Sequence, residues 1–140
     1  IADPVSDLSL IGKPGPTLPN QNWIGDKPEL EGKAVLLFFW APWSLPCKKF
    51  LSPMAGFQKE FEGKLQVVGV LGEDTTEARN AAASCGFPSL IDAGGKLVAG
   101  AGVSSIPFVL LVNAKGTVLY AGHPAALNEK NLDVLLEKAE

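Results

Sequence analysis

Residues Ala34 to Trp40 are seven consecutive apolar residues. Successive side chains of a strand point to opposite faces, so an unbroken apolar run of this length is typical of a central strand covered on both faces. The run is far too short to cross a bilayer. A second buried strand is predicted at 65–71. We therefore expect one α/β domain over residues 1–140, with helices on both faces of a central sheet and residues 1–22 as an extended N-terminal arm.

The other expected strands are shorter and are bounded by turn residues. They lie near Thr17–Leu18, on both sides of a turn at 92–95 within 90–98, at 108–112, and at 117–120 after a hairpin turn at 113–116. Together with the helices below, they give the order βαβαββα after the arm.

Apolar residues at helical spacing, together with capping residues, predict three helices. They cover about 45–61, the segment from an Asp74–Glu77 capping box to Gly86, and the segment from the cap Asn128 through Ala139. Pro53 lies inside the first helix and should kink it, because proline lacks the backbone N–H and clashes with the preceding turn.

Composition excludes several classes of function. The chain has 140 residues, a net charge of −3 and no basic cluster beyond Lys48–Lys49, which argues against nucleic acid or an anionic membrane as the main partner. Its two cysteines, Cys47 and Cys85, are too few for a disulfide framework. Neither has another Cys or His at metal-ligand spacing, so we expect no metal site.

The segment Ser44-Leu45-Pro46-Cys47 lies where the first buried strand turns into a helix. Pro46 suits a first helical turn, where a backbone N–H is not needed. Ser44 suits the N-cap, with a hydroxyl that accepts from a first-turn amide such as that of Cys47. The positive end of a helix favours a reactive thiolate. Cys47 is thus a candidate nucleophile or, on the simpler interpretation, a buried and inert apolar residue.

The residues around this segment resemble the thioredoxin superfamily. The resemblance is carried by Trp40-Ala41-Pro42-Trp43 before the site, Leu45-Pro46 inside it, and Ser105-Ile106-Pro107 before a later strand. Within the superfamily, the chain is most similar to the TlpA/ResA/DsbE class of exported thiol-disulfide oxidoreductases. Gly12-Lys13-Pro14-Gly15-Pro16 and the lead-in from Leu30 to Trp40 match that class as well.

The resemblance implies a thioredoxin fold with a mixed sheet, and a role for each matching position. Position 44 would carry the exposed nucleophilic Cys, Cys47 would be the buried resolving thiol, and Pro107 would be a cis-proline facing the pair. The substrate-binding residues implied are Trp43, Leu45, Pro46, Ile106 and Pro107. The reaction would be thiol-disulfide exchange with protein disulfides, without a bound cofactor, and would require a redox partner protein.

The resemblance also implies an extracytoplasmic location, periplasmic or secreted, in a bacterium. The chain opens at Ile1 without a signal-peptide pattern. We expect that an export signal or lipid anchor upstream of Ile1 has been removed.

Ser44 departs from the family pattern at the position that matters most. A serine hydroxyl cannot form a disulfide, so we expect this chain to be inactive in dithiol exchange. An engineered Cys-to-Ser change and a natural divergence compete as explanations. The intact frame around Cys47 fits the first. Phe38 and Phe50, which replace polar residues common in relatives, fit the second. We favour the engineered change.

Two other functions are open. A natural member with Ser44 would be a non-catalytic binding module or a monothiol protein. A peroxiredoxin-like peroxidase would use Cys47, since peroxiredoxins place Thr or Ser three residues before their reactive Cys. That function needs a cationic partner, and the only arginine is Arg79 on another predicted helix.

Cys85 and His123 are lesser candidates. Cys85 lies at a helix end beside Gly86 and is expected to be a packed thiol, with a regulatory thiol or a disulfide to Cys47 as alternatives. His123 lies between Gly122 and Pro124 without a ligand set, as expected of a loop residue.

Overall fold

The computed structural model describes residues 10–103 and 105–138; the expectations for 1–9 and Ala139 lie outside this range. The described residues form a six-stranded sheet in the order β1-β4-β3-β2-β5-β6. The strands are β1 Trp23–Ile24, β2 Ala34–Trp40, β3 Leu65–Leu71, β4 Ser89–Ile91, β5 Phe108–Val112 and β6 Val118–Gly122. β2, β3 and β4 run parallel, whereas β1, β5 and β6 pair antiparallel with their neighbours. The sheet is therefore mixed, as expected.

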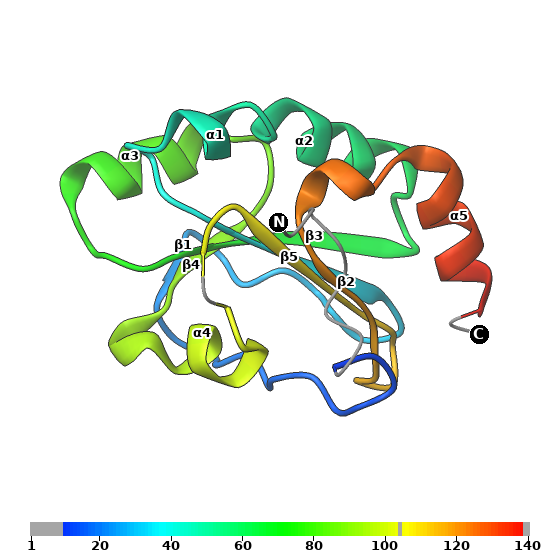
Figure 1. Ribbon diagram of the computed structural model, residues 1–140. Helices are drawn as coiled ribbons and strands as arrows, with labels where there is room; N and C mark the ends of the chain where they lie inside the picture. Colours follow the sequence, from blue (N-terminus) through cyan, green and yellow to red (C-terminus); the bar gives the residue numbers. More distant parts are fainter. Residues whose placement is uncertain (1–9, 104, 139–140) are drawn as a thin grey trace.

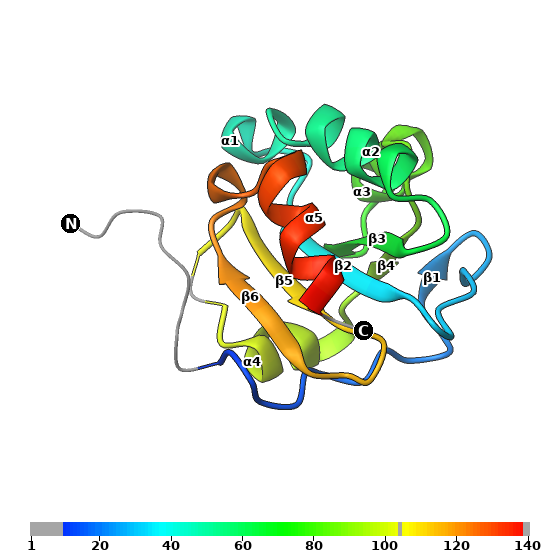
Figure 2. The same ribbon diagram turned by 90° about the vertical axis from the view of Figure 1, so that its right-hand side faces the viewer.

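Helices cover both faces of the sheet. They are α1 Leu45–Lys48, α2 Leu51–Glu60, α3 Thr76–Ser84, α4 Lys96–Ala101 and α5 Glu129–Lys138, with short 3-10 turns η1 Ala93–Gly95 and η2 Pro124–Ala126. Four of the α-helices lie over one face, and α4 lies over the other, as both views show (Figure 1 and Figure 2). No helix in the described part of the chain is long and apolar enough to span a membrane.

The middle of the sheet is β2, which pairs with β3 along its whole length and with β5 along most of it. Leu36, Phe38 and Trp40 pack into the core beneath α2, α3 and α5. Leu37 and Phe39 pack into the core on the α4 side. All five side chains are at most 2% exposed. Burial of each such side chain stabilises the fold by about 1.5–3 kcal/mol, so the two-sided burial predicted for this run is confirmed.

The helix expected over 45–61 is broken in two. Its first part ends at Lys48 and its second begins at Leu51, with Pro53 in the first turn of α2. In one continuous helix, the Pro53 ring would clash with the carbonyl of Lys49, four residues earlier. The proline therefore acts as predicted, but the break lies ahead of it, at residues 49–50.

The N-cap expected at Asp74 is wrong by one residue. The cap is Thr75, whose extended backbone lets Oγ1 accept from the Ala78 amide at 3.0 Å. The Asp74 carboxylate instead accepts two hydrogen bonds from the Arg79 guanidinium. The helix ends as expected, with Gly86 following at a φ of 94°.

The pair of short strands expected within 90–98 is also wrong. β4 ends at Ile91, and the chain continues as η1 and α4. The buried Asp92 carboxylate accepts from the amides of Leu97 at 2.9 Å and Val98 at 3.0 Å. These bonds satisfy first-turn donors of α4, which would otherwise lack partners inside the molecule, so Asp92 starts a helix at this point.

The N-terminal arm contains no strand at Thr17–Leu18. The arm instead touches the sheet at an isolated bridge between Pro14 and Thr117, and the first strand is β1 at Trp23–Ile24. β1 pairs with β4 at one edge of the sheet. The arm therefore borders the sheet near β6 before the chain reaches the opposite edge.

Two predicted polar turns are confirmed. Asn113 Oδ1 accepts from the amides of Lys115 and Thr117, each at 2.9 Å, and closes the turn between β5 and β6. Asn128 Oδ1 accepts from the Asn131 amide at 2.9 Å, and Asn131 Oδ1 accepts from the Asn128 amide at 2.8 Å. This reciprocal pair caps the start of α5.

The packing around Gly69 of β3 provides a test of this core. A Cβ atom at Gly69 would collide with Ser89 Oγ and would lie 2.8 Å from Trp40 Nε1 and 3.0 Å from Phe87 Cε1. We expect Gly69→Ala to lower the free energy of unfolding by about 1–3 kcal/mol, because the core would be overpacked. Urea denaturation measures the change.

The matched control is Gly56→Ala in α2, where a Cβ atom would meet nothing within 4 Å. This substitution should raise stability by about 0.5–1 kcal/mol, because alanine loses less backbone entropy in a helix. A Gly69→Ala variant as stable as the parent would contradict the packing described here.

Candidate functional site

The Ser44–Cys47 segment lies at the end of β2, where α1 begins. Ser44 is the N-cap of α1, with an extended backbone, and its Oγ accepts from the Cys47 amide at 3.4 Å. The Ser44 carbonyl also accepts from the amides of Cys47 and Lys48, each at 3.1 Å. Pro46 occupies the first turn. The local geometry is the one that the residue types predict.

Burial separates the residues of this segment into two groups. Trp43 is 64% exposed and Leu45 is 71% exposed, whereas Ser44 is 8% exposed and Cys47 is fully buried. Trp43 and Leu45 are two of the four large apolar side chains that are exposed among the described residues. The exposed side chain expected at position 44 is therefore wrong: Ser44 is buried between two exposed apolar neighbours, and the Cys47 thiol is buried as well.

Pro107 lies at the same end of the sheet as the Ser44–Cys47 segment, where β2 ends. β5 runs antiparallel to β2, with Phe39 paired to Phe108, so the start of β5 meets the end of β2. The peptide bond between Ile106 and Pro107 is cis. Ile106 is half-buried and Pro107 is buried. The fold therefore brings Cys47 and Pro107, which are 60 residues apart in the chain, to the same end of the sheet.

Glu73 also belongs to this end of the sheet, and sequence reasoning missed it. Its carboxylate accepts a hydrogen bond from Trp43 Nε1 at 2.7 Å. β2 and β3 are parallel, with Trp40 paired to Leu71, so the segments that follow them emerge side by side. An acidic residue two positions after the second buried strand was the available signal.

The protein around Cys47 is apolar. Phe38 is fully buried and stacks against Trp40, with ring centroids 6.2 Å apart. Phe50 is half-buried and meets the His123 ring edge-on, with centroids 5.5 Å apart. Asp92 is the buried carboxylate among the described residues, and it caps α4 on the other face. The described residues thus place no buried carboxylate on the face of the sheet that carries Cys47.

His123 is held within its own loop. Its Nδ1 accepts from the Ala125 amide at 3.0 Å, and its carbonyl accepts from the Tyr120 hydroxyl at 3.0 Å. Burial raises the pKa of Tyr120, because the charged phenolate is disfavoured away from water. These bonds fit the expected loop role of His123.

Cys85 is a free, half-buried thiol, and Cys47 is free as well, so no disulfide joins them. The Cys85 sulfur lies 3.3 Å from the carbonyl oxygens of Ala82 and Phe87, either of which can accept its one proton. These contacts fit a packed thiol at the end of α3.

Arg79 is engaged away from Cys47. Its Nε lies 2.6 Å from Asp74 Oδ1, and its Nη2 donates to Asp74 Oδ2 at 3.0 Å. The hydrogen bond from Arg79 lowers the pKa of Asp74, and the same bond raises the pKa of Arg79. The peroxidase function thus gains no support, because its required cation already has a carboxylate partner.

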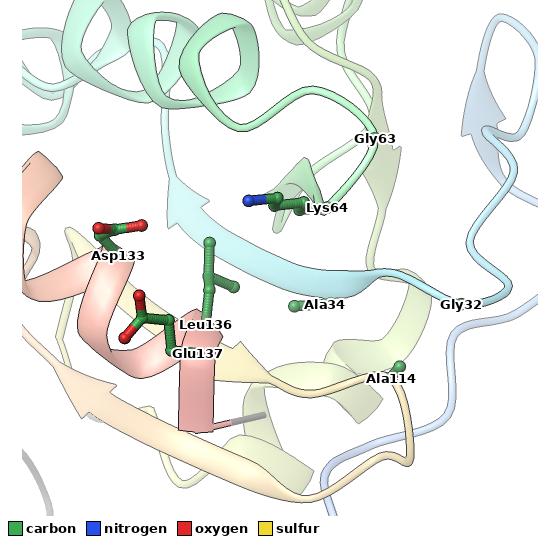
Figure 3. A pocket seen from close by; sticks show the side chains of 8 residues that line it. All are labelled: Gly32, Ala34, Gly63, Lys64, Ala114, Asp133, Leu136 and Glu137. Atoms are coloured by element: carbon green, nitrogen blue, oxygen red, sulfur yellow. The ribbon is translucent and has the colours of Figure 1, made fainter. Parts of the chain in front are cut away.

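A cavity of about 290 Å³ lies at the opposite end of the sheet, beside the start of β2. Lys64 projects from one wall, facing Asp133 and Glu137 on α5 (Figure 3). The described residues that line this cavity include no thiol, hydroxyl or imidazole.

The two thiols should differ in their reactivity. In the native protein we expect iodoacetamide to alkylate Cys85 at least about tenfold faster than Cys47, since reaction at a fully buried thiol awaits local opening. Peptide mapping by mass spectrometry over time gives both rates, and in denaturant the two should converge. Equal rates in the native state would contradict the burial of Cys47, and Cys85→Ser serves as the control for assigning the fast phase.

The chain was compared with known proteins. The AhpC/TSA family matches residues 12–121. Thioredoxin-like protein YneN from Bacillus subtilis is 32% identical over 135 residues, which are 90% of this chain and 78% of YneN. Thiol-disulfide oxidoreductase ResA from Bacillus subtilis is 35% identical over 95 residues, which are 65% of this chain; the chain spans 53% of ResA.

Among solved structures, DsbE from Chlorobium tepidum superimposes with a TM-score of 0.65 at 29% identity and covers 77% of this chain and 80% of its own. A thioredoxin-like protein solved in its oxidised form matches with a TM-score of 0.69 at 18% identity, over 98% of this chain and 97% of its own. The expected thioredoxin fold is thereby confirmed. The chain belongs to the AhpC/TSA family and, within the thioredoxin superfamily, to its TlpA/ResA/DsbE-like members.

Proposed function

We propose that this chain is the scaffold of a thiol-disulfide oxidoreductase that acts on protein disulfides and is disarmed by Ser44. The observation that carries the proposal is that two exposed apolar side chains lie beside a buried thiol. Trp43 and Leu45 flank position 44 at the surface, and Cys47 lies in the first helical turn beneath it.

With cysteine at position 44, the exchange would proceed in two displacements. The thiolate at position 44 attacks one sulfur of the substrate disulfide, forms a mixed disulfide and releases the other substrate sulfur as a thiolate. The Cys47 thiolate then attacks the sulfur at position 44 and releases the second substrate thiolate. The substrate disulfide gains two electrons from the 44–47 sulfur pair, and its two thiolates take up from water the two protons that the attacking thiols released. The 44–47 pair is thereby oxidised to a disulfide that a redox partner protein reduces.

The chain as it stands cannot complete this cycle. Ser44 has oxygen where the first displacement needs sulfur, and a hydroxyl forms no disulfide. The intact cap and the two exposed apolar side chains favour an engineered replacement of Cys by Ser. Sequencing of codon 44 in the source gene tests that origin, because a serine codon there contradicts it.

The substrate segment would lie across the edge formed by Trp43, Leu45, Pro46, Ile106 and Pro107. Trp43, Leu45 and Pro46 are exposed, so they are available for apolar contact. The resemblance to exported relatives supports an extracytoplasmic location, with anchoring through a segment upstream of Ile1. No bound cofactor is required, because both electrons travel through the sulfur pair.

Restoring the sulfur tests the scaffold. We expect Ser44→Cys to reduce insulin disulfides catalytically in the presence of dithiothreitol, whereas the parent chain and Ser44→Ala should match the uncatalysed rate. The double variant Ser44→Cys/Cys47→Ser should form a mixed disulfide without turning over, because the resolving thiol is gone. An inactive but folded Ser44→Cys variant would contradict the enzyme scaffold and indicate a non-catalytic binding module.

A further inference from the structure

We propose that Trp43 and Glu73 form a recognition site for a cationic side chain, lysine or arginine, on the protein segment that docks at position 44. This inference deepens the proposed function and rests on it for the identity of the docking segment. The site combines an aromatic face with a carboxylate, and each of these groups attracts a cation.

The hydrogen bond between the two residues fixes the aromatic face. Trp43 Nε1 donates to Glu73 Oε1 at 2.7 Å, across 30 positions of sequence. The indole remains 64% exposed. One edge of the ring is therefore anchored to the fold while much of its surface stays open to solvent. An anchored ring loses less entropy on binding than a freely rotating one.

The charge of Glu73 is not used within the described part of the molecule. The indole N–H is neutral, so the hydrogen bond leaves the carboxylate with its full negative charge. The ion pair found among the described residues joins Arg79 to Asp74, the acid next to Glu73. Asp74 is thus neutralised, whereas no Lys or Arg nitrogen of the described residues lies within 4 Å of the Glu73 carboxylate. A hydrogen bond to the indole alone would need only a neutral oxygen.

The position of the pair limits where the cation must lie on the partner. Trp43 immediately precedes position 44, and Glu73 follows β3 at the same end of the sheet. An extended chain advances about 3.3 Å per residue, so a basic residue within about two positions of the reacting cysteine can reach this pair. The net charge of −3 would also attract a basic segment at longer range.

Peptide binding to the unmodified chain tests the site without any redox step. The probes are three extended peptides with S-methylcysteine at the centre and Arg, Ala or Glu two positions away. The indole N–H resonance of Trp43, assigned by comparison with Trp43→Phe, reports binding in ¹⁵N-correlated NMR spectra. We expect the Arg peptide to bind about three- to tenfold more tightly than the Ala peptide, and the Glu peptide to bind most weakly.

Glu73→Gln should abolish this preference, because glutamine keeps an oxygen for the indole N–H and removes only the charge. Glu77→Gln, which removes an exposed acid on the adjacent helix, is the matched control and should leave the preference intact. The proposal is overturned if no peptide shifts the Trp43 resonance, if Arg and Ala peptides bind equally, or if Glu73→Gln retains the preference.

The same preference should appear in catalysis by Ser44→Cys. For disulfide-linked versions of the peptides, kcat/KM should favour Arg over Ala by a similar factor, and Glu73→Gln should bring the Arg-to-Ala ratio of kcat/KM close to one. If Ser44→Cys is inactive while the NMR preference holds, the proposed function fails and the cation site stands. If Ser44→Cys acts equally on all peptides and NMR shows no preference, the cation site fails and the oxidoreductase stands.

Discussion

The pairing of β2 with β3 on one side and β5 on the other is the constraint on which the candidate site depends. β2 is buried on both faces, so its register cannot shift by one residue without exchanging the side chains of the two cores. The parallel partner β3 and the antiparallel partner β5 are fixed by the same register. As a result, three segments meet at one end of the sheet. They are the segment after β2, the segment after β3 and the segment before β5. Ser44, Glu73 and Pro107 come from these three segments.

At the start of α1, the backbone amides are satisfied while two apolar side chains are left exposed. The helix terminus must satisfy its first amides, and Ser44 does so through its carbonyl and hydroxyl oxygens. The fold also leaves Trp43 and Leu45 in water, although burying an apolar side chain of this size would stabilise the chain by about 1.5–3 kcal/mol. Under the proposed function, that stabilisation is available to a docked partner.

Sequence reasoning succeeded where a single local pattern decides the structure. The apolar run of β2, the Asn113 turn, the Asn128 cap and the Ser44 cap follow from residue type and spacing. It failed where two residues compete for one role, as at Thr75, which caps α3 because Arg79 engages Asp74. It failed again at Asp92, because its two bonds to α4 amides require a folded turn through Gly94 and Gly95. Glu73 was missed because its contact with Trp43 spans two strands and has no local pattern.

With oxygen instead of sulfur at position 44, the proposed site would keep its docking surface but lose thiol-disulfide exchange. The cap of α1 needs only an acceptor at this position, and the serine hydroxyl provides one. The bond from Trp43 to Glu73 involves no atom of the Ser44 side chain. The proposed thiol-disulfide exchange, in contrast, requires sulfur at position 44 as well as at Cys47. A chain with Ser44 should therefore keep its fold and its docking surface while losing turnover, and this combination lets recognition be measured in the absence of chemistry.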